Sequence, residues 1–270
     1  MAVTLSINVS NIASAMASFN VIKIKRVPEV LVFVIISPIM FVLLFAYVFG
    51  GSIDIPGGSY REFLIGGIFA QTVVFGATFT GAGIADDIHK GIINRFRSLP
   101  MSQSAVLVGR TASDVIYNFL SLLIMALSGL VVGWRFHNGL LSAALGFGLL
   151  LLFAYAFSWI MGYIGLLVPS VEVINNAAFM VIFPLTFVAN TFVPAENLPT
   201  VLRAFAEWNP VSAVTQAARD LFGNLPAGIP EPTVWPLRNA VLYTLIWVVL
   251  IIAVFAPLAV HRYRTAAKRG

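Results

Sequence analysis

The sequence predicts an all-α membrane protein with six transmembrane helices. Its 270 residues are 59% hydrophobic and 10% charged, and their mean hydropathy is +0.94. Soluble domains are about one-quarter charged, so lipid is expected to surround most of this chain. Lipid requires backbone polar groups to be paired internally, which leaves helices or closed barrels, and long continuous apolar runs favour helices. The sequence contains no cysteine, which excludes disulfides, zinc-thiolate sites and cysteine nucleophiles.

Six apolar runs are long enough to be spans, because a helix needs about 20 apolar residues to cross about 30 Å of hydrocarbon. Pro38 lies in the first of them and Pro184 in the fifth, and the backbone hydrogen bond lost at each proline makes bending easier. We therefore expect a permease-like transmembrane domain over residues 30–261. The predicted spans are 30–49, 63–84, 115–132, 140–168, 173–193 and 240–260.

The positions of the basic residues predict the orientation of the chain. Most of the 16 Lys and Arg residues lie near the two termini or between the second and third spans. The positive-inside rule then predicts that both termini lie in the cytoplasm. Residues 1–29 form a cytoplasmic segment without a cleavable signal, and 10–26 are expected to be an amphipathic helix on the inner leaflet. Residues 262–270 form a basic tail.

The segment 194–237 is neither a span nor a plain polar loop, because apolar side chains alternate with prolines along it. We expect two short helices, 198–208 and 210–222, that dip into the outer leaflet. Non-helical backbone at that depth requires cover by protein or water. This part is therefore predicted to be an outer re-entrant region.

The polar loop 85–110 joins the second and third spans. Its apolar residues Ile88, Ile92 and Phe96 recur at helical spacing, opposite Lys90 and Arg97. A short amphipathic helix tied at both ends to membrane helices would pass a motion on to them. The acidic pair at its start is expected to cap that helix, where the macrodipole favours anions. The candidate residues for docking a partner are Asp86, Asp87, Ile88, Lys90, Ile92, Arg95, Phe96, Arg97, Leu99 and Pro100.

Polar and aromatic residues inside the spans are candidates for a substrate path. Polar side chains in membrane helices mark transport paths or bond neighbouring helices. Aromatic rings stack on flat ligands or pack helices together. Both alternatives stay open for the candidates, which are Gln71, Phe75, Phe79, Asn176, Phe179, Phe183 and Asn190.

Several chemistries are missing from the sequence. It has no P-loop and no H-E-x-x-H motif, and its three histidines lie at span ends on different sides of the membrane. The chain is therefore not expected to be an enzyme or to hold a metal. A membrane-embedded transferase would have to use Asp86, Asp87 and His89, whose spacing matches no known motif. A channel would need more polar residues along the spans, and a scaffold would only anchor a partner.

The chain resembles the type-2 ABC transporter permeases, and within them the daunorubicin-resistance (DrrB-like) drug-efflux branch. The motifs that carry the resemblance are PEVLVFVIISPIMFVLLFAYVFGG, SYREFLIGGIFAQTVVFGATFTGAGIADDIHKGIINRFRSLPMSQSAVLVGR and NPVSAVTQAARDLFG. It implies a pair of permease chains, identical or related, with two copies of a cytoplasmic ATPase that binds ATP and Mg. Residues 86–100 would be the coupling helix docked on that ATPase. The implied cargo is an anthracycline-like drug or another antibiotic; the alternative is a lipid or lipid-linked glycan.

Overall fold

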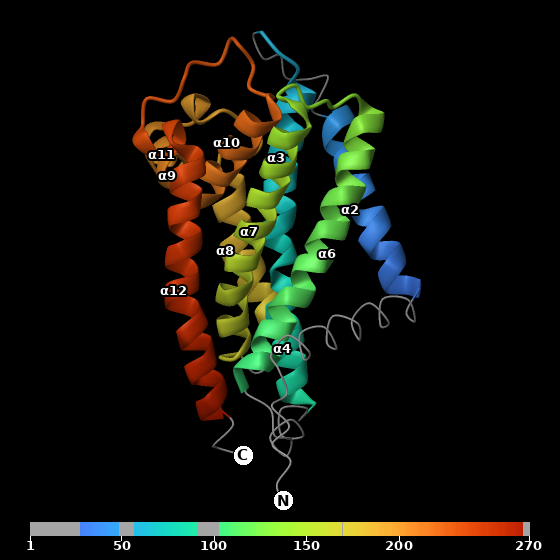
Figure 1. The fold of residues 1–270 in the computed structure, drawn as a ribbon, viewed down its shortest axis with the longest axis vertical. Coiled ribbons are helices and arrows are strands. Elements are labelled where there is room, and N and C mark those ends of the chain that lie inside the picture. The colour runs from blue at the N-terminus through green and yellow to red at the C-terminus, as the bar shows by residue number, and fades with distance from the viewer. Residues whose placement is uncertain (1–27, 49–56, 91–102, 169, 267–270) are drawn as a thin grey trace, which may run out of the picture.

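The computed structural model describes residues 28–48, 57–90, 103–168 and 170–266, and within these ranges it contains helices and no strands. The all-helical prediction is therefore confirmed for the described residues. The helices run lengthwise through an elongated bundle, with α3 and α7 near its middle (Figure 1). The elements are α2 (Pro28–Val48), α3 (Tyr60–Gly76), α4 (Thr78–His89), α6 (Gln103–Val132), α7 (Gly139–Gly165), α8 (Val171–Phe187), η1 (Ala195–Asn197), α9 (Thr200–Trp208), α10 (Pro210–Phe222), α11 (Trp235–Arg238) and α12 (Ala240–Ala266).

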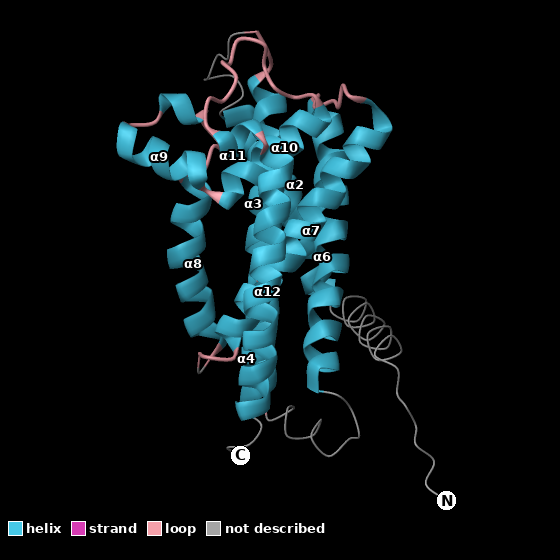
Figure 2. Cartoon of the chain, turned by 60° about the vertical axis from the view of Figure 1, so that its left-hand side comes forward, coloured by secondary structure: helices cyan, strands magenta, loops and turns pink. Residues whose placement is uncertain are grey.

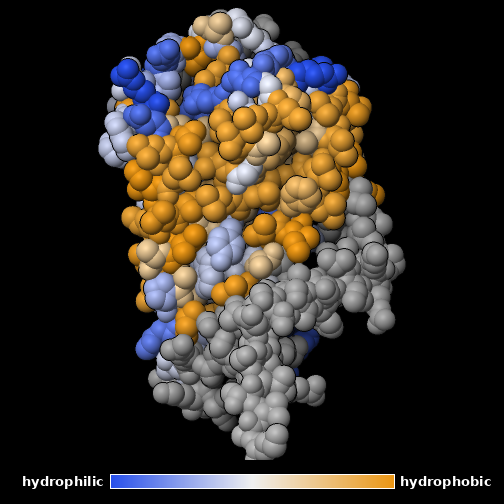
Figure 3. Space-filling model, viewed as in Figure 1, coloured by the Kyte–Doolittle hydropathy of each residue, from blue (hydrophilic) through white to orange (hydrophobic). Residues whose placement is uncertain are grey.

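Within the described residues, four segments are long and apolar enough to cross a membrane. They are Tyr60–His89, Leu107–Val132, Gly139–Gly165 and Ala240–Tyr263. The apolar helices Pro38–Val48 and Val171–Phe187 are shorter. A belt of apolar side chains surrounds the middle of the face seen in Figure 3, and hydrophilic side chains gather at its upper end. The chain thus has the surface of a membrane protein, with four long apolar segments among the described residues.

Helix α3 lies at the centre of the bundle because its apolar residues face neighbours on nearly every side. Leu64, Ile65, Ile68, Phe69 and Val73 are all fully buried. Helices α6, α7 and α10 pack against α3, and α7 also packs along α4 and α12. A helix that is apolar all round is expected in such a position.

The second predicted span is broken in two. Helix α3 ends at Gly76 and α4 begins at Thr78, with Ala77 between them. The Thr78 hydroxyl donates to the Phe75 carbonyl oxygen at 2.7 Å, which satisfies one of the carbonyls at the end of α3. Ala77 itself keeps right-handed helical dihedrals, with φ of −64° and ψ of −19°, so the helical path continues across the junction.

The predicted position of the acidic pair was wrong. Helix α4 continues through Asp86 and Asp87 to His89, so the pair lies in the last turn of a helix and not at the start of one. The continuation has two local causes. Ile84 is buried, and Lys90 Nζ lies 2.7 Å from Asp86 Oδ2, four residues away on the same face. The ion pair between Lys90 and Asp86 offsets the cost of a carboxylate at the C-terminal end of the helix, where the helix dipole disfavours negative charge.

Three other predicted boundaries also differ. Helix α6 begins at Gln103, so the end of the predicted 85–110 loop belongs to this helix, and α12 runs to Ala266 through part of the predicted tail. Helix α8 ends at Phe187, which places Asn190 in the following turn. That turn is bonded to α10, since the Asn190 backbone N–H donates to Ser212 Oγ at 3.1 Å. The predicted interfacial helix at 10–26 lies outside the described residues.

Helices α9, α10 and α11 lie at the end of the bundle opposite the C-terminal end of α12 (Figure 2). The bounds of α10 equal the predicted range 210–222, because its end signals are strong. The Asn209 side chain accepts from the Val211 N–H, Pro210 occupies the first turn, and Gly223 takes the left-handed conformation with φ of 73°.

Arg219 of α10 is fully buried and joins three segments of the chain. Its Nε donates to the Phe63 carbonyl at 2.8 Å, Nη1 to Asn190 at 2.8 Å and Nη2 to Thr191 at 2.7 Å. The guanidinium also lies 3.4 Å from the centroid of the Phe63 ring. Gly67 lets the Thr191 backbone approach so closely that a Cβ would not fit. This arrangement fixes α3, α10 and the turn after α8 relative to one another.

Candidate functional site

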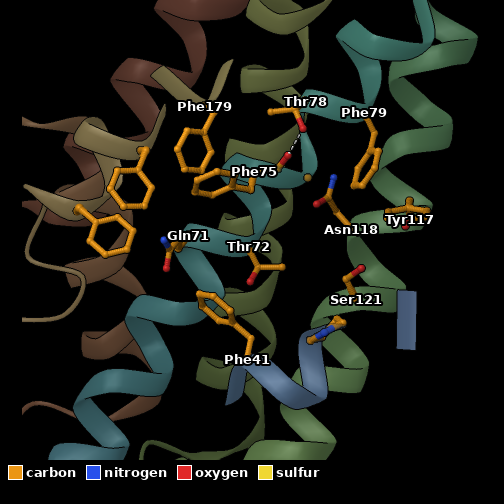
Figure 4. Close-up of a pocket in the computed structure, with 14 residues that line it drawn as sticks. Phe41, Gln71, Thr72, Phe75, Thr78, Phe79, Tyr117, Asn118, Ser121 and Phe179 are labelled. Atoms are coloured by element: carbon orange, nitrogen blue, oxygen red, sulfur yellow. Dashed lines mark hydrogen bonds between the residues drawn. The ribbon is translucent and has the colours of Figure 1, made fainter. Parts of the chain in front are cut away.

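A cavity of about 480 Å³ lies where α2, the α3–α4 junction, α6 and α8 converge. Side chains from α3 and α6 point into it from facing walls, and Phe41 of α2 and Phe179 of α8 contribute from two further sides (Figure 4). Its lining residues are Pro38, Phe41, Gln71, Thr72, Phe75, Gly76, Thr78, Phe79, Tyr117, Asn118, Ser121, Phe179, Phe183 and Phe187. Aromatic rings form most of this wall, and amides and hydroxyls supply its polar groups.

The lining residues carry no formal charge, but two of them present hydrogen-bonding capacity that the protein does not use. Gln71 Oε1 and Asn118 Oδ1 are buried, and neither has a hydrogen-bond partner among the described residues. The Asn118 amide nitrogen, in contrast, donates to the Asp114 carbonyl at 2.9 Å. An unpaired buried acceptor costs about 1–3 kcal/mol, so structural packing alone does not explain two of them beside one cavity.

A row of contacting aromatic rings connects α8 with α2. Along α8, the ring centroids of Phe179 and Phe183 are 4.9 Å apart and those of Phe183 and Phe187 are 4.0 Å apart. Phe192 lies 4.8 Å from Phe187 and 4.9 Å from Phe45 of α2. Centroid distances of 4.5–7 Å are typical of attractive ring pairs. The row extends the aromatic wall of the cavity toward the turn that follows α8.

The structure brings together five of the seven residues predicted for a substrate path. Gln71, Phe75, Phe79, Phe179 and Phe183 all line the cavity. Asn176 does not line it, and its side chain is exposed. Asn190 is buried in the turn after α8, where its amide nitrogen lies 3.4 Å from Gln216 Oε1.

The lining residues of α6 were missed from the sequence. Tyr117, Asn118 and Ser121 lie on one helical face, at spacings of one, three and four residues. A polar stripe within an apolar span is a signal that sequence reasoning can use, but it does not show which neighbouring helix the stripe faces. The residues Phe45 and Phe192 were missed for a similar reason, since they meet only through the packing of two distant segments.

The predicted docking residues are only partly within the described chain. Asp86, Asp87, Ile88 and Lys90 lie at the C-terminal end of α4, and Ile88 packs beside the cluster of Ile84, Leu107, Trp159 and Tyr263. Ile92, Arg95, Phe96, Arg97, Leu99 and Pro100 lie outside the described residues. In the part of the chain that the structure describes, no three His, Asp or Glu residues come together as a metal site would require.

Comparison with known proteins identifies the family. Residues 13–222 match the model of the ABC-2 type transporter family, which is well over half of the chain. The chain belongs to the ABC-2 type transporter family. Family membership makes it a membrane permease subunit that pairs with an ATP-binding-cassette ATPase, and this agrees with the apolar helices described above.

Individual relatives of this ABC-2 permease carry names that refer to drug resistance. It is 32% identical to the daunorubicin resistance ABC transporter permease protein DrrB1 of Streptomyces coeruleorubidus, over 97% of this chain and 88% of that protein. It is 23% identical to the probable doxorubicin resistance ABC transporter permease protein DrrC of Mycobacterium tuberculosis, over 86% of this chain and 81% of that protein. The similarity extends over nearly the whole permease, including the helices that form the cavity.

Proposed function

We propose that this permease exports flat, amphiphilic, drug-like compounds across the bacterial cytoplasmic membrane, and that the cavity between α2, α3, α6 and α8 lies on the path of the cargo. The observation that carries the proposal is the cavity wall, where rings such as Phe75 and Phe183 surround a few amides and hydroxyls. Such a wall offers ring faces for stacking and a small number of polar groups for orientation. Relatives named for anthracycline resistance support the same cargo class.

The proposal includes the assembly and the topology. Six spans are formed by α2, α3 with α4, α6, α7, α8 and α12, with both termini in the cytoplasm and α9 and α10 in the outer leaflet. Two permease chains, identical or related, pair with two ATPase subunits, which hold ATP and Mg²⁺. The 85–110 stretch docks on the ATPase, and ATP-driven closure of the ATPase subunits moves the inner end of α4. The support is the position of Lys90 and its neighbours at the inner end of that helix.

The test is ATP-driven uptake of a fluorescent anthracycline into inverted vesicles that carry this chain and its ATPase. Phe183→Ala removes a ring from the cavity wall, and we expect uptake to fall by about five-fold or more, since a stacked ring pair and its buried area contribute about 1–3 kcal/mol. Phe119→Ala is the matched control, because Phe119 of α6 is 54% exposed and does not line the cavity.

Each outcome of this experiment has a separate meaning. Equal uptake by Phe183→Ala and the wild type would show that the cavity is not on the path. ATP hydrolysis without anthracycline uptake by the wild type would favour the second candidate cargo, a lipid or lipid-linked glycan. Failure of the chain to co-purify with any ATPase would contradict the assembly.

A further inference from the structure

Helix α6 carries three polar residues, each one turn from the next, that face α3 and α4. Arg110, Asp114 and Asn118 are spaced by four residues and therefore share one face of the helix. Asp114 is 8% exposed and Asn118 is 1% exposed. Ionisable and amide side chains are rare inside membrane helices, so a stripe of them needs a physical explanation.

Each residue of this stripe meets a small residue of the facing helix. The Thr80 hydroxyl donates to Asp114 Oδ2. Asn118 Oδ1 lies against Gly76, and the Arg110 guanidinium lies against Gly83, both so closely that a Cβ on either glycine would force the side chain away. Arg110 also interacts electrostatically with Asp114. We call these six residues the polar seam.

The stability of the bundle does not require this seam. Hydrogen bonds between membrane helices contribute only about 0.6 kcal/mol on average, and a buried carboxyl is costly to place there. Asn118 adds to the cost, because its Oδ1 finds no partner. Apolar side chains of similar size would hold the two helices together at least as well, so the seam is better explained by what it does than by what it stabilises.

The location of the seam suggests that role. Helix α4 precedes the stretch between Lys90 and Gln103, and α6 follows it. The polar seam joins these two helices directly. Its last pair, Asn118 and Gly76, lies at the junction of α3 and α4, and both residues line the cavity. If the inner end of α4 is displaced, a continuous set of contacting residues therefore connects it to the cavity wall.

Building on the proposed function, we propose that Asp114 and Thr80 are positioning residues that make α4 and α6 move as one unit. The directional hydrogen bond fixes the register of the two helices, which sliding apolar contacts would not do. A motion of the stretch between them is then delivered to the α3–α4 junction and changes the shape of the cavity. Without the bond, α4 would move alone and ATP hydrolysis would be uncoupled from transport.

The test measures cargo transported and ATP hydrolysed in the same reconstituted permease–ATPase complex. Thr80→Val keeps the shape of the side chain and removes the donor, and Thr80→Ser keeps the donor. We expect Thr80→Val to hydrolyse ATP normally while transport per ATP falls by about five-fold or more, the lower range of coupling between distinct sites. Thr80→Ser should restore the wild-type ratio. Thr111→Val is the control, since the buried Thr111 hydroxyl bonds only to carbonyls of its own helix, at Leu107 and Val108.

A second readout separates this proposal from the proposed function. Spin labels on His89→Cys and Ile116→Cys report the distance between α4 and α6 with and without trapped nucleotide, whatever the cargo. Both positions are exposed. We expect an unchanged distance in the wild type and a nucleotide-dependent change with Thr80→Val. A wild-type ratio in Thr80→Val, or equal loss of hydrolysis and transport in the valine and serine variants, would overturn the proposal. Absence of transport by the wild type alone would contradict only the cargo assignment.

Discussion

At the scale of single residues, Arg219 is a fully buried cation whose donors must be satisfied by the protein itself. Its guanidinium donates to three backbone carbonyls from two segments of the chain and lies on the Phe63 ring. A planar fork with several donors can satisfy this geometry, and the single ammonium of lysine cannot. Because the side chain is fully buried, water cannot replace any bond that is lost.

We therefore expect Arg219→Met to lower the free energy of unfolding by about 3 kcal/mol or more, since it removes three buried, charge-assisted hydrogen bonds. Thermal unfolding of the purified protein in detergent measures the effect. Arg203→Met serves as the control, because Arg203 forms a partly exposed pair with Glu207 at 2.8 Å, which is expected to contribute about 0.3–0.5 kcal/mol. Similar losses in both variants would show that the buried arginine has no special role.

At the scale of elements, a close backbone contact joins α4 and α7. The backbones of Gly81 and Gly165 meet directly, and a Cβ on Gly165 would lie 2.9 Å from the Gly81 Cα. Small residues allow this approach, which is a common basis of packing between membrane helices. The contact holds α4, with its link to the 85–110 loop, against the long α7.

Gly165→Ala is expected to destabilise the protein by about 1–3 kcal/mol, because backbone atoms cannot move aside as side chains do. Gly148→Ala on the same helix is the matched comparison. A Cβ there meets nothing within 4 Å, so the higher helix propensity of alanine should leave stability unchanged or raise it by up to about 1 kcal/mol. Thermal unfolding of the two variants side by side gives the answer; an equally stable Gly165→Ala protein would mean that α4 and α7 can separate at no cost.

Sequence reasoning was accurate for elements whose end signals are local. The predicted range 210–222 equals α10, whose ends in the structure are set by Asn209, Pro210 and Gly223. Reasoning was inaccurate where tertiary contacts decide, as at the end of α8, where bonds from α10 hold Asn190 outside the helix. The aromatic cavity residues of α8 were predictable from their spacing of four. Asn118, which lines the same cavity, was not predictable, because nothing in α6 indicates which helix Asn118 will face.

At the scale of the whole molecule, the proposed topology places the loop between α10 and α11 outside and the end of α4 inside. The natural chain has no cysteine, so a single introduced thiol reports its own side of the membrane. Thr233 and Lys90 are both exposed. In intact cells we expect a membrane-impermeant maleimide to label Thr233→Cys and to leave Lys90→Cys unlabelled until the membrane is permeabilised. The reverse pattern would invert the orientation and contradict export.

The cavity wall has a consequence for energetics, because it carries rings, amides and hydroxyls and no countercharge. A bacterial membrane is electrically negative inside, and moving one positive charge outward against that voltage costs about 2.3 kcal/mol per 100 mV. With no carboxylate along the wall to neutralise a protonated amine, a cationic cargo would cross with its charge exposed to the field. Its export should therefore slow as the voltage rises, while a neutral cargo of the same shape would leave at an unchanged rate.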